Sequence, residues 1–145
     1  MTAPATTASA PPRSIRKSIS AIFVGFFTVA ALSLVTDQVL HVFHVYPPWG
    51  QSMFDPGLNF LALSYRLVYT VLGSYITAKL APRNPMRHAI ILGVIGLIAG
   101  TAGVIATLPL HLGPSWYPIA IALTALPCAW LGGFLYVRKP RQAYG

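Results

Sequence analysis

Acidic residues are almost absent from this chain of 145 residues, which contains two carboxylates, Asp37 and Asp55. General acid–base catalysis therefore has few candidate groups, and Asp55 opens an Asp-Pro-Gly turn where its role is structural. The single cysteine, Cys128, excludes an intrachain disulfide and a zinc site built on cysteines. The sequence also lacks a nucleophile elbow and a phosphate-binding loop. These absences favour a non-enzymatic protein.

Charged residues of both signs are scarce as well. They form 8% of the chain, against 55% hydrophobic residues, and the mean hydropathy is +0.65. A soluble domain has about a quarter charged residues. Four apolar stretches, each near the ~20 residues that cross a bilayer, occupy residues 19–42, 58–81, 86–110 and 117–137. The sequence predicts an all-α fold, a four-transmembrane-helix bundle of two up-down hairpins in the lipid bilayer, with no room for a second domain.

The basic residues predict how the bundle is oriented. The connections at residues 43–57 and 111–116 contain no Lys or Arg. Nine of the ten basic residues flank the other ends of the spans, as Arg13, Arg16, Lys17, Lys79, Arg83, Arg87, Arg138, Lys139 and Arg141. The positive-inside rule then places both termini in the cytoplasm. Because the membrane explains the net charge of +8, nucleic acid is not expected as a partner.

The two ends of the chain differ from the spans. Residues 1–18 begin with Ala, Thr, Ser and Pro and are predicted to be a disordered cytoplasmic tail, while residues 138–145 form a basic cytoplasmic tail. A secretory signal is a competing interpretation of residues 13–34. However, this apolar run is long for a signal, and no clear small-x-small cleavage site precedes a polar mature start.

Small residues line one face of the third apolar stretch at a spacing of three and four. The members of this glycine ridge are Ala89, Gly93, Gly96, Gly100, Gly103, Thr107 and His111. Small residues let helices approach closely, so this helix is predicted to be the centre of packing. The same ridge supports an alternative, in which it joins a second copy of the chain or another membrane partner. On the fourth stretch the predicted packing stripe is Ala120, Thr124, Cys128 and Gly132.

Two charges lie away from the ends of the apolar stretches, Asp37 and Arg66. Asp37 is ~27 Å along the first helix and Arg66 ~12 Å along the second, which runs back, at 1.5 Å per residue. Both depths fall in the outer part of a ~30 Å hydrocarbon core. An unpaired guanidinium is costly there. We therefore predict an intramembrane ion pair between Asp37 and Arg66.

Further polar side chains are expected at the same level, in an outer polar cluster. His41 and His44 follow Asp37 at i+4 and i+7, and the other members are Tyr65, Tyr69 and His111. Imidazole and carboxylate groups at this spacing are also compatible with a divalent metal held by His41, His44 and His111, with a haem, or with a proton relay. No metal or haem motif is present, so no cofactor is predicted and these sites stay as alternatives.

Several stretches together resemble a family of small, uncharacterised bacterial four-span integral membrane proteins. They are Thr36–Asp37, Tyr46–Trp49, Tyr65–Arg66, Leu80–Ala89 and Trp116–Trp130. The likeness covers residues 16–137. It implies a bacterial inner membrane and a compact helical bundle. It implies no activity, so no catalytic residue is carried over.

Three functions are compatible with the sequence. The favoured one is a small non-enzymatic scaffold or subunit, stabilised by the pair of Asp37 and Arg66. The second is a transporter or channel component that uses these two residues and the outer-side histidines. The third is an outward-facing metal or haem site. A dry, packed outer end with a closed ion pair favours the first function, a hydrated vestibule that reaches Arg66 the second, and two histidines within metal-bonding distance the third.

Overall fold

The structure, a computed structural model, describes residues 14–140. It contains no strand in that range and four α-helices, which confirms the all-helical prediction. They are α1 (Ile15–Val42), α2 (Pro56–Leu80), α3 (Pro85–Thr107), which a short 3-10 turn (Leu108–Leu110) extends, and α4 (Trp116–Arg138). The predicted tails fall largely outside the described residues. The prediction that residues 15–18 belong to the tail is wrong, because α1 begins at Ile15. Arg16 and Lys17 are good helix formers, which favours this earlier start.

Three of the helices are long and apolar enough to cross a membrane. They are α1, α3 with its 3-10 extension, and α4. The chain is therefore a multi-pass helical membrane protein by length and composition. The remaining helix, α2, has 25 residues, but it is more polar and buries Asn59, Ser74 and Thr77.

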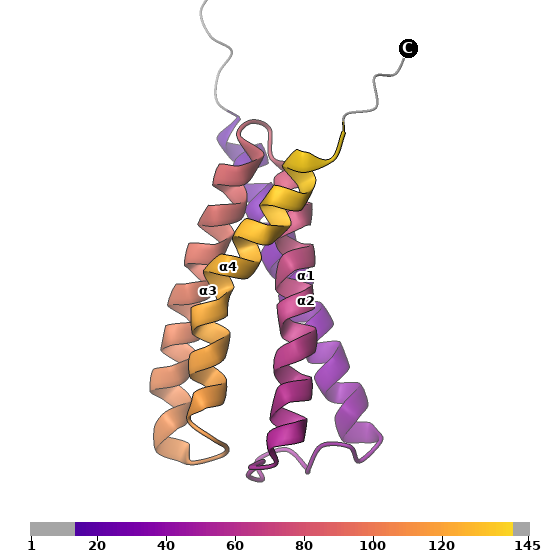
Figure 1. The fold of residues 1–145 in the computed structure, drawn as a ribbon, viewed down its shortest axis with the longest axis vertical. Coiled ribbons are helices and arrows are strands. Elements are labelled where there is room, and N and C mark those ends of the chain that lie inside the picture. The colour runs from indigo at the N-terminus through magenta and orange to yellow at the C-terminus, as the bar shows by residue number, and fades with distance from the viewer. Residues whose placement is uncertain (1–13, 141–145) are drawn as a thin grey trace, which may run out of the picture.

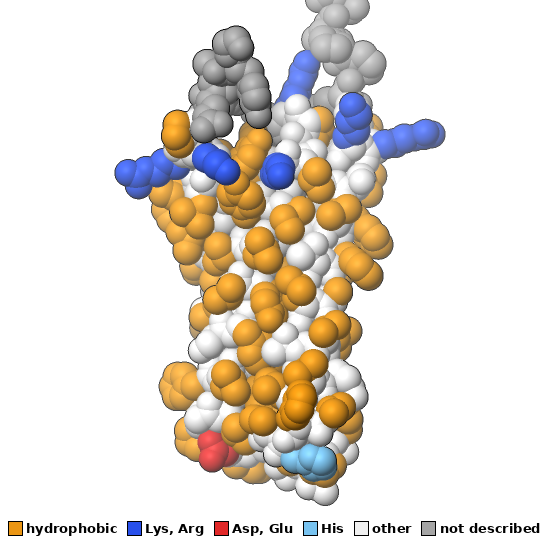
Figure 2. Space-filling model, turned by 90° about the vertical axis from the view of Figure 1, so that its right-hand side faces the viewer, with side chains coloured by type: hydrophobic (Ala, Val, Ile, Leu, Met, Phe, Trp, Pro, Cys, Tyr) orange, Lys and Arg blue, Asp and Glu red, His pale blue; other side chains and the backbone are white. Residues whose placement is uncertain are grey.

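The helices form two antiparallel hairpins, α1 with α2 and α3 with α4 (Figure 1). One end of the bundle contains the start of α1, the turn between α2 and α3, and the end of α4. We call it the basic end. Figure 2 shows Lys and Arg gathered there, while the acidic and histidine side chains visible on this face lie at the opposite end, the loop end. The hairpins separate toward the loop end (Figure 1).

Short sequence signals set the helix ends. Asp55 caps α2, because its carboxylate accepts a hydrogen bond from the Leu58 amide at 3.0 Å, and Pro56 occupies the first helical position. His44 and His111 take left-handed backbone conformations, with φ values of 57° and 48°, just beyond the ends of α1 and of the 3-10 turn. This conformation ends a helix.

Glycines bring the backbones together in the basic half. A methyl group added at Gly25 of α1 would lie 2.6 Å from the Gly73 carbonyl oxygen, and one at Gly73 would lie 2.7 Å from the Gly25 carbonyl oxygen. Gly132 of α4 packs equally closely on α2, where an added methyl group would lie inside contact distance of the Val71 carbonyl oxygen. Because no side chain fits between these backbones, α1 and α4 are each in direct contact with α2 here.

The glycine ridge of α3 packs against α4 of the same chain. Added methyl groups at Gly93, Gly96 and Gly100 would meet α4 alanines at 2.6 to 3.3 Å, namely Ala129, Ala125 and Ala122. The contact ends before Gly103, where an added methyl group would have no neighbour within 4 Å. The ridge therefore divides into a packed part and an open part near the loop end.

The predicted stripe of α4 is confirmed at Gly132 and wrong at its other three positions. The buried residues are Ala122, Ala125, Ala129, Gly132 and Gly133, whereas Ala120, Thr124 and Cys128 are half-buried. The reason is that α4 contacts two helices, α3 and α2, along different lines. A single stripe chosen by spacing cannot describe a helix that has two neighbours.

Candidate functional site

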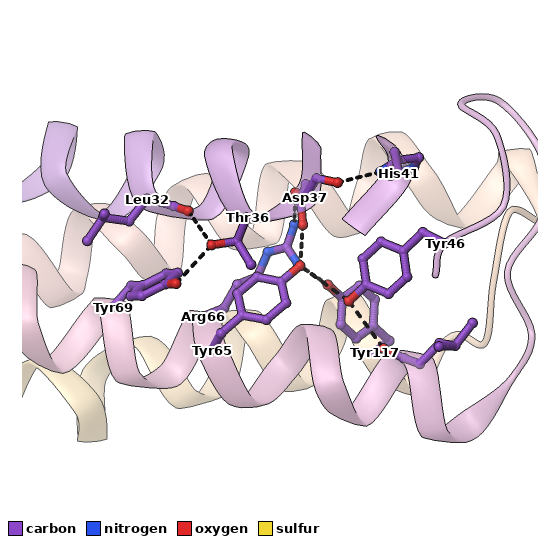
Figure 3. A network of polar contacts seen from close by, with 10 residues as sticks. Leu32, Thr36, Asp37, His41, Tyr46, Tyr65, Arg66, Tyr69 and Tyr117 are labelled. Atoms are coloured by element: carbon purple, nitrogen blue, oxygen red, sulfur yellow. Dashed lines mark hydrogen bonds and ion pairs between the residues drawn. The ribbon is translucent and has the colours of Figure 1, made fainter. Parts of the chain in front are cut away.

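An ion pair joins α1 to α2 in the loop half of the bundle (Figure 3). Arg66 Nη2 lies 2.5 Å from Asp37 Oδ2, and the two side chains are 25% and 9% exposed. Asp37 lies ~7.5 Å from the end of α1 and Arg66 ~15 Å from the start of α2 at 1.5 Å per residue. The long arginine stem spans the difference in depth. The structure thus brings together the two charges that the sequence placed at similar depth.

Two tyrosines complete the surroundings of this pair. The Tyr65 hydroxyl donates a hydrogen bond to the second carboxylate oxygen of Asp37. Arg66 Nη1 donates to the hydroxyls of Tyr65 and Tyr117, at 3.0 and 2.7 Å. The guanidinium carbon also lies 5.2 and 5.9 Å from the centres of these two rings, within cation–π range. Arg66 therefore connects its own helix, α2, to both α1 and α4.

The loop between α1 and α2 contributes a further hydroxyl. Tyr46 is 5% exposed, and its hydroxyl lies 3.4 Å from the Tyr65 hydroxyl and 3.5 Å from the Leu58 carbonyl oxygen, as a long hydrogen-bond donor. Burial raises the pKa of Tyr46, so this hydroxyl keeps its proton. The Tyr65 hydroxyl then has one acceptor partner, Asp37, and two donor partners, which uses its full capacity. We call Asp37, Arg66, Tyr46, Tyr65 and Tyr117 the Arg66 network.

A second polar link between α1 and α2 lies one turn deeper. Thr36 Oγ1 and the Tyr69 hydroxyl are 2.8 Å apart. Thr36 also donates to the Leu32 carbonyl oxygen at 2.8 Å, so Tyr69 is the donor in the first bond. Tyr69, which the sequence assigned to the outer polar cluster, therefore supports the α1–α2 contact without touching the ion pair.

The three outer histidines do not converge. His41 Nδ1 donates to the Asp37 carbonyl oxygen at 2.7 Å, and its ring stacks on Trp49 at 3.9 Å between centroids. His44 and His111 are exposed at the two helix ends described above. Within residues 14–140, no group of three His, Cys, Asp or Glu side chains is arranged to hold a metal. The geometry thus assigns these histidines to helix ends and aromatic packing.

A cavity of 320 Å³ lies between the two hairpins in the loop half. Arg66 and Asn59 of α2 form its polar wall. The other lining residues come from α3 and its extension, from α4 and from both loops, and are Met53, Gly100, Gly103, Thr107, Leu108, Leu112, Gly113, Pro114, Tyr117, Pro118 and Ile121. The side chains among them are mostly apolar, so the guanidinium lies at the edge of a largely hydrocarbon-lined space.

A second cavity, of 230 Å³, lies beneath the loop between α1 and α2. Asp37, His41 and Trp49 line it, and it shares Arg66 and Tyr117 with the first cavity. The Arg66 network therefore separates two spaces.

Sequence reasoning missed three residues of this site. Tyr46 and Tyr117 were not assigned to the ion pair, because tyrosines near the ends of spans are common at membrane interfaces for other reasons. Asn59 is 1% exposed, and its amide nitrogen donates to the Met53 and Asp55 carbonyl oxygens at 3.0 and 2.7 Å. Its signal was available, since it is the one asparagine within the four apolar stretches.

Tyrosine-to-phenylalanine variants measure the contribution of the hydroxyls. We expect Tyr117→Phe to lower the free energy of unfolding in detergent by about 1–2 kcal/mol, because it removes a hydrogen bond from a charged donor. Tyr65→Phe should lower it more, since its hydroxyl contacts both charges. The matched control is Tyr136→Phe, a half-buried tyrosine whose hydroxyl has no hydrogen bond within the described residues. An equal loss in all three variants would contradict a special role of the network.

Comparisons with protein-family models, with curated proteins and with solved structures find no match for this chain. Its function is therefore inferred from the geometry of its own side chains.

Proposed function

We propose that the chain crosses the membrane four times, with both termini and the turn between α2 and α3 in the cytoplasm, in a bacterial inner membrane. Two observations support α2 as the fourth span. It has the length to cross, and its buried polar residues Asn59, Ser74 and Thr77 face other helices and not lipid. The clustering of Lys and Arg at the basic end supports the orientation (Figure 2).

Cysteine labelling tests this topology. In a Cys128→Ser background, Gln51→Cys places a thiol in the exposed loop after α1, and Pro82→Cys places one in the exposed turn after α2. We expect a membrane-impermeant maleimide to label the Gln51→Cys variant in spheroplasts and the Pro82→Cys variant only after permeabilisation. Labelling of both variants in intact spheroplasts would rule out an α2 that crosses the bilayer.

We infer that the molecular role is that of a non-enzymatic membrane scaffold or subunit. The observation that carries this proposal is the shared position of Arg66, which bonds side chains of α1, α2 and α4. Both acidic residues of the chain have structural partners, Asp37 in the Arg66 network and Asp55 as a helix cap. Neither carboxylate is thus free to act as a general base. Variants that neutralise Asp37 or Arg66 test whether the ion pair stabilises the bundle, as this role requires.

A component of a transporter is the second candidate, and one observation favours it. The cavity between the hairpins reaches Arg66, a charge deep within α2. In the basic half, however, Ser74 of α2 is fully buried and a methyl group added at Gly132 of α4 would lie 2.7 Å from its Cβ atom, so the space does not continue there. A transporter must open this half in a second conformation. In a Cys128→Ser background, reaction of a Ser74→Cys variant with a membrane-permeant maleimide would favour this candidate, and an unreactive thiol would favour the scaffold.

A further inference from the structure

The cavity between the hairpins has features of a ligand site that the scaffold role does not use. We propose that it binds a single-chain amphiphile with an oxyanion headgroup, a carboxylate or a phosphate monoester. The headgroup lies at Arg66, and the acyl chain lies along the open part of the glycine ridge at Gly103. The ligand comes from the surrounding lipid.

Arg66 lines the cavity and retains hydrogen-bonding capacity. A guanidinium has five N–H donors, and the Arg66 network uses three of them within the described residues. Its side chain is 25% exposed and lines the cavity. The remaining donors, Nε–H and the second N–H of Nη2, have no hydrogen-bond partner among the described residues. An oxygen anion is the group that such donors bind best.

The rest of the cavity suits a hydrocarbon chain. Its walls away from Arg66 and Asn59 are largely Leu, Pro, Ile, Met and Gly. The missing contacts around Gly103 leave a space next to α3 that no side chain of residues 14–140 fills. The volume of 320 Å³ is at the small end of the ~300–1,000 Å³ typical of ligand sites, which favours one chain over two.

An amphiphile also matches both parts of the cavity, the apolar walls and the guanidinium donors. Water is poorly held by apolar walls, and an empty apolar space beside a guanidinium leaves N–H donors without partners. A chain with an anionic oxygen headgroup covers the walls and satisfies the donors together. Neither a pure hydrocarbon nor a free inorganic anion does both.

The closed ends of the cavity indicate the route of entry. At the loop end, the Met53 amide donates to the Leu112 carbonyl oxygen at 2.7 Å and joins the two loops across the gap between the hairpins. In the basic half, the close contact of Gly132 of α4 with the α2 backbone closes the space between these two helices. The hydrogen bond from Arg66 to Tyr117 joins α2 to α4 at the cavity, and no residue of α1 lines it, so we place the entry between α2 and α3.

Quenching of tryptophan fluorescence by a brominated fatty acid tests the proposal. Trp116 precedes the cavity residue Tyr117, so the full chain with Trp49→Phe and Trp130→Phe has one reporter at the cavity. We expect saturable quenching in a neutral maltoside detergent at pH 9. The variant Gly103→Leu should weaken binding by about tenfold or more, because its side chain occupies the space beside α3.

The matched control adds the same side chain outside the cavity. Ala102→Leu lies on the next position of α3, is exposed and does not line the cavity, so it should bind as the parent does. The methyl ester of the same fatty acid should bind about tenfold more weakly, because it cannot place an anion at Arg66. Unchanged melting temperatures of both leucine variants exclude a folding defect.

The possible results distinguish the type of headgroup and include results that would contradict the proposal. Binding of the fatty acid alone assigns a carboxylate headgroup, binding of a brominated lysophosphatidate alone assigns a phosphate, and binding of both assigns oxyanions in general. Non-saturable quenching, equal binding by Gly103→Leu, or equal binding of the ester would overturn the proposal. So would a Gly103→Leu variant that changes only the oligomeric state, which would identify a second copy as the occupant. None of these results depends on the stability effects that test the scaffold role.

Discussion

Neutralising Asp37 or Arg66 alone should lower the free energy of unfolding by about 3–5 kcal/mol, because each change leaves the partner charge buried and uncompensated. The variants are Asp37→Asn and Arg66→Gln, unfolded in detergent by a titration with sodium dodecyl sulfate and followed by circular dichroism. The 9% exposure of Asp37 makes water a poor substitute for the guanidinium. Of all substitutions in the loop half, these two should have the largest effect.

The double variant distinguishes a pair from two separate contributions. Asp37→Asn combined with Arg66→Gln removes both charges, so it should be milder than either single change, with a coupling well outside additivity. Asp55→Asn is the matched control, because asparagine also caps a helix and the exposed carboxylate of Asp55 pairs with no cation among the described residues. If the losses of unfolding free energy from Asp37→Asn and Arg66→Gln are strictly additive, the two residues do not act as a pair, and the scaffold proposal is contradicted.

Alanine at Gly132 should destabilise the bundle by about 3 kcal/mol, the upper end of the usual cost of overpacking. The added methyl group would collide with the Val71 carbonyl oxygen and lie 2.9 Å from the Tyr75 amide nitrogen, both on the α2 backbone. Backbone atoms in the middle of a helix cannot rotate away as a side chain can. Either α2 and α4 must separate or the variant must fail to accumulate, and the unfolding titration and the yield report these outcomes.

Gly103→Ala is the matched comparison on α3. This glycine has no neighbour within 4 Å of the added methyl group, so alanine should raise the free energy of unfolding by about 0.5–1 kcal/mol through its better helix propensity. The two variants make the same chemical change in helices of similar length and should move stability in opposite directions. A loss of stability at Gly103 similar to that at Gly132 would show that the hairpins close over the cavity in solution.

The sequence predicted the helices well because their signals are local. Long apolar runs, the Asp-Pro-Gly cap before α2 and the prolines around the turn at residues 81–85 each act within a few residues. The orientation was predicted from the number of Lys and Arg residues in each connection, which is also a local property. The ion pair could also be predicted, since Asp37 and Arg66 had no other charged residue at their depth with which to pair. In the structure, Arg66 Nη2 lies 2.5 Å from Asp37 Oδ2.

The packing was harder to predict because it depends on which helix is the neighbour. The glycine ridge of α3 was recognised, but its spacing did not indicate that α4 covers it only as far as Gly100. The close contact of Gly25 with Gly73 was not predicted at all, although both glycines are visible in the sequence. A small residue permits a close approach without specifying the partner.

Composition, hydropathy and charge determined by themselves that this chain is helical, is suited to a membrane and carries its cations at one end. Those properties follow from single segments and their transfer between water and lipid, so they need no knowledge of neighbours. Only the tertiary structure decided that Tyr46 and Tyr117 join the ion pair, that the histidines stay apart, and that the hairpins leave a cavity beside Arg66. These features depend on crossing positions and on loop conformation, where side chains distant in the sequence meet and residue spacing along one helix carries no information.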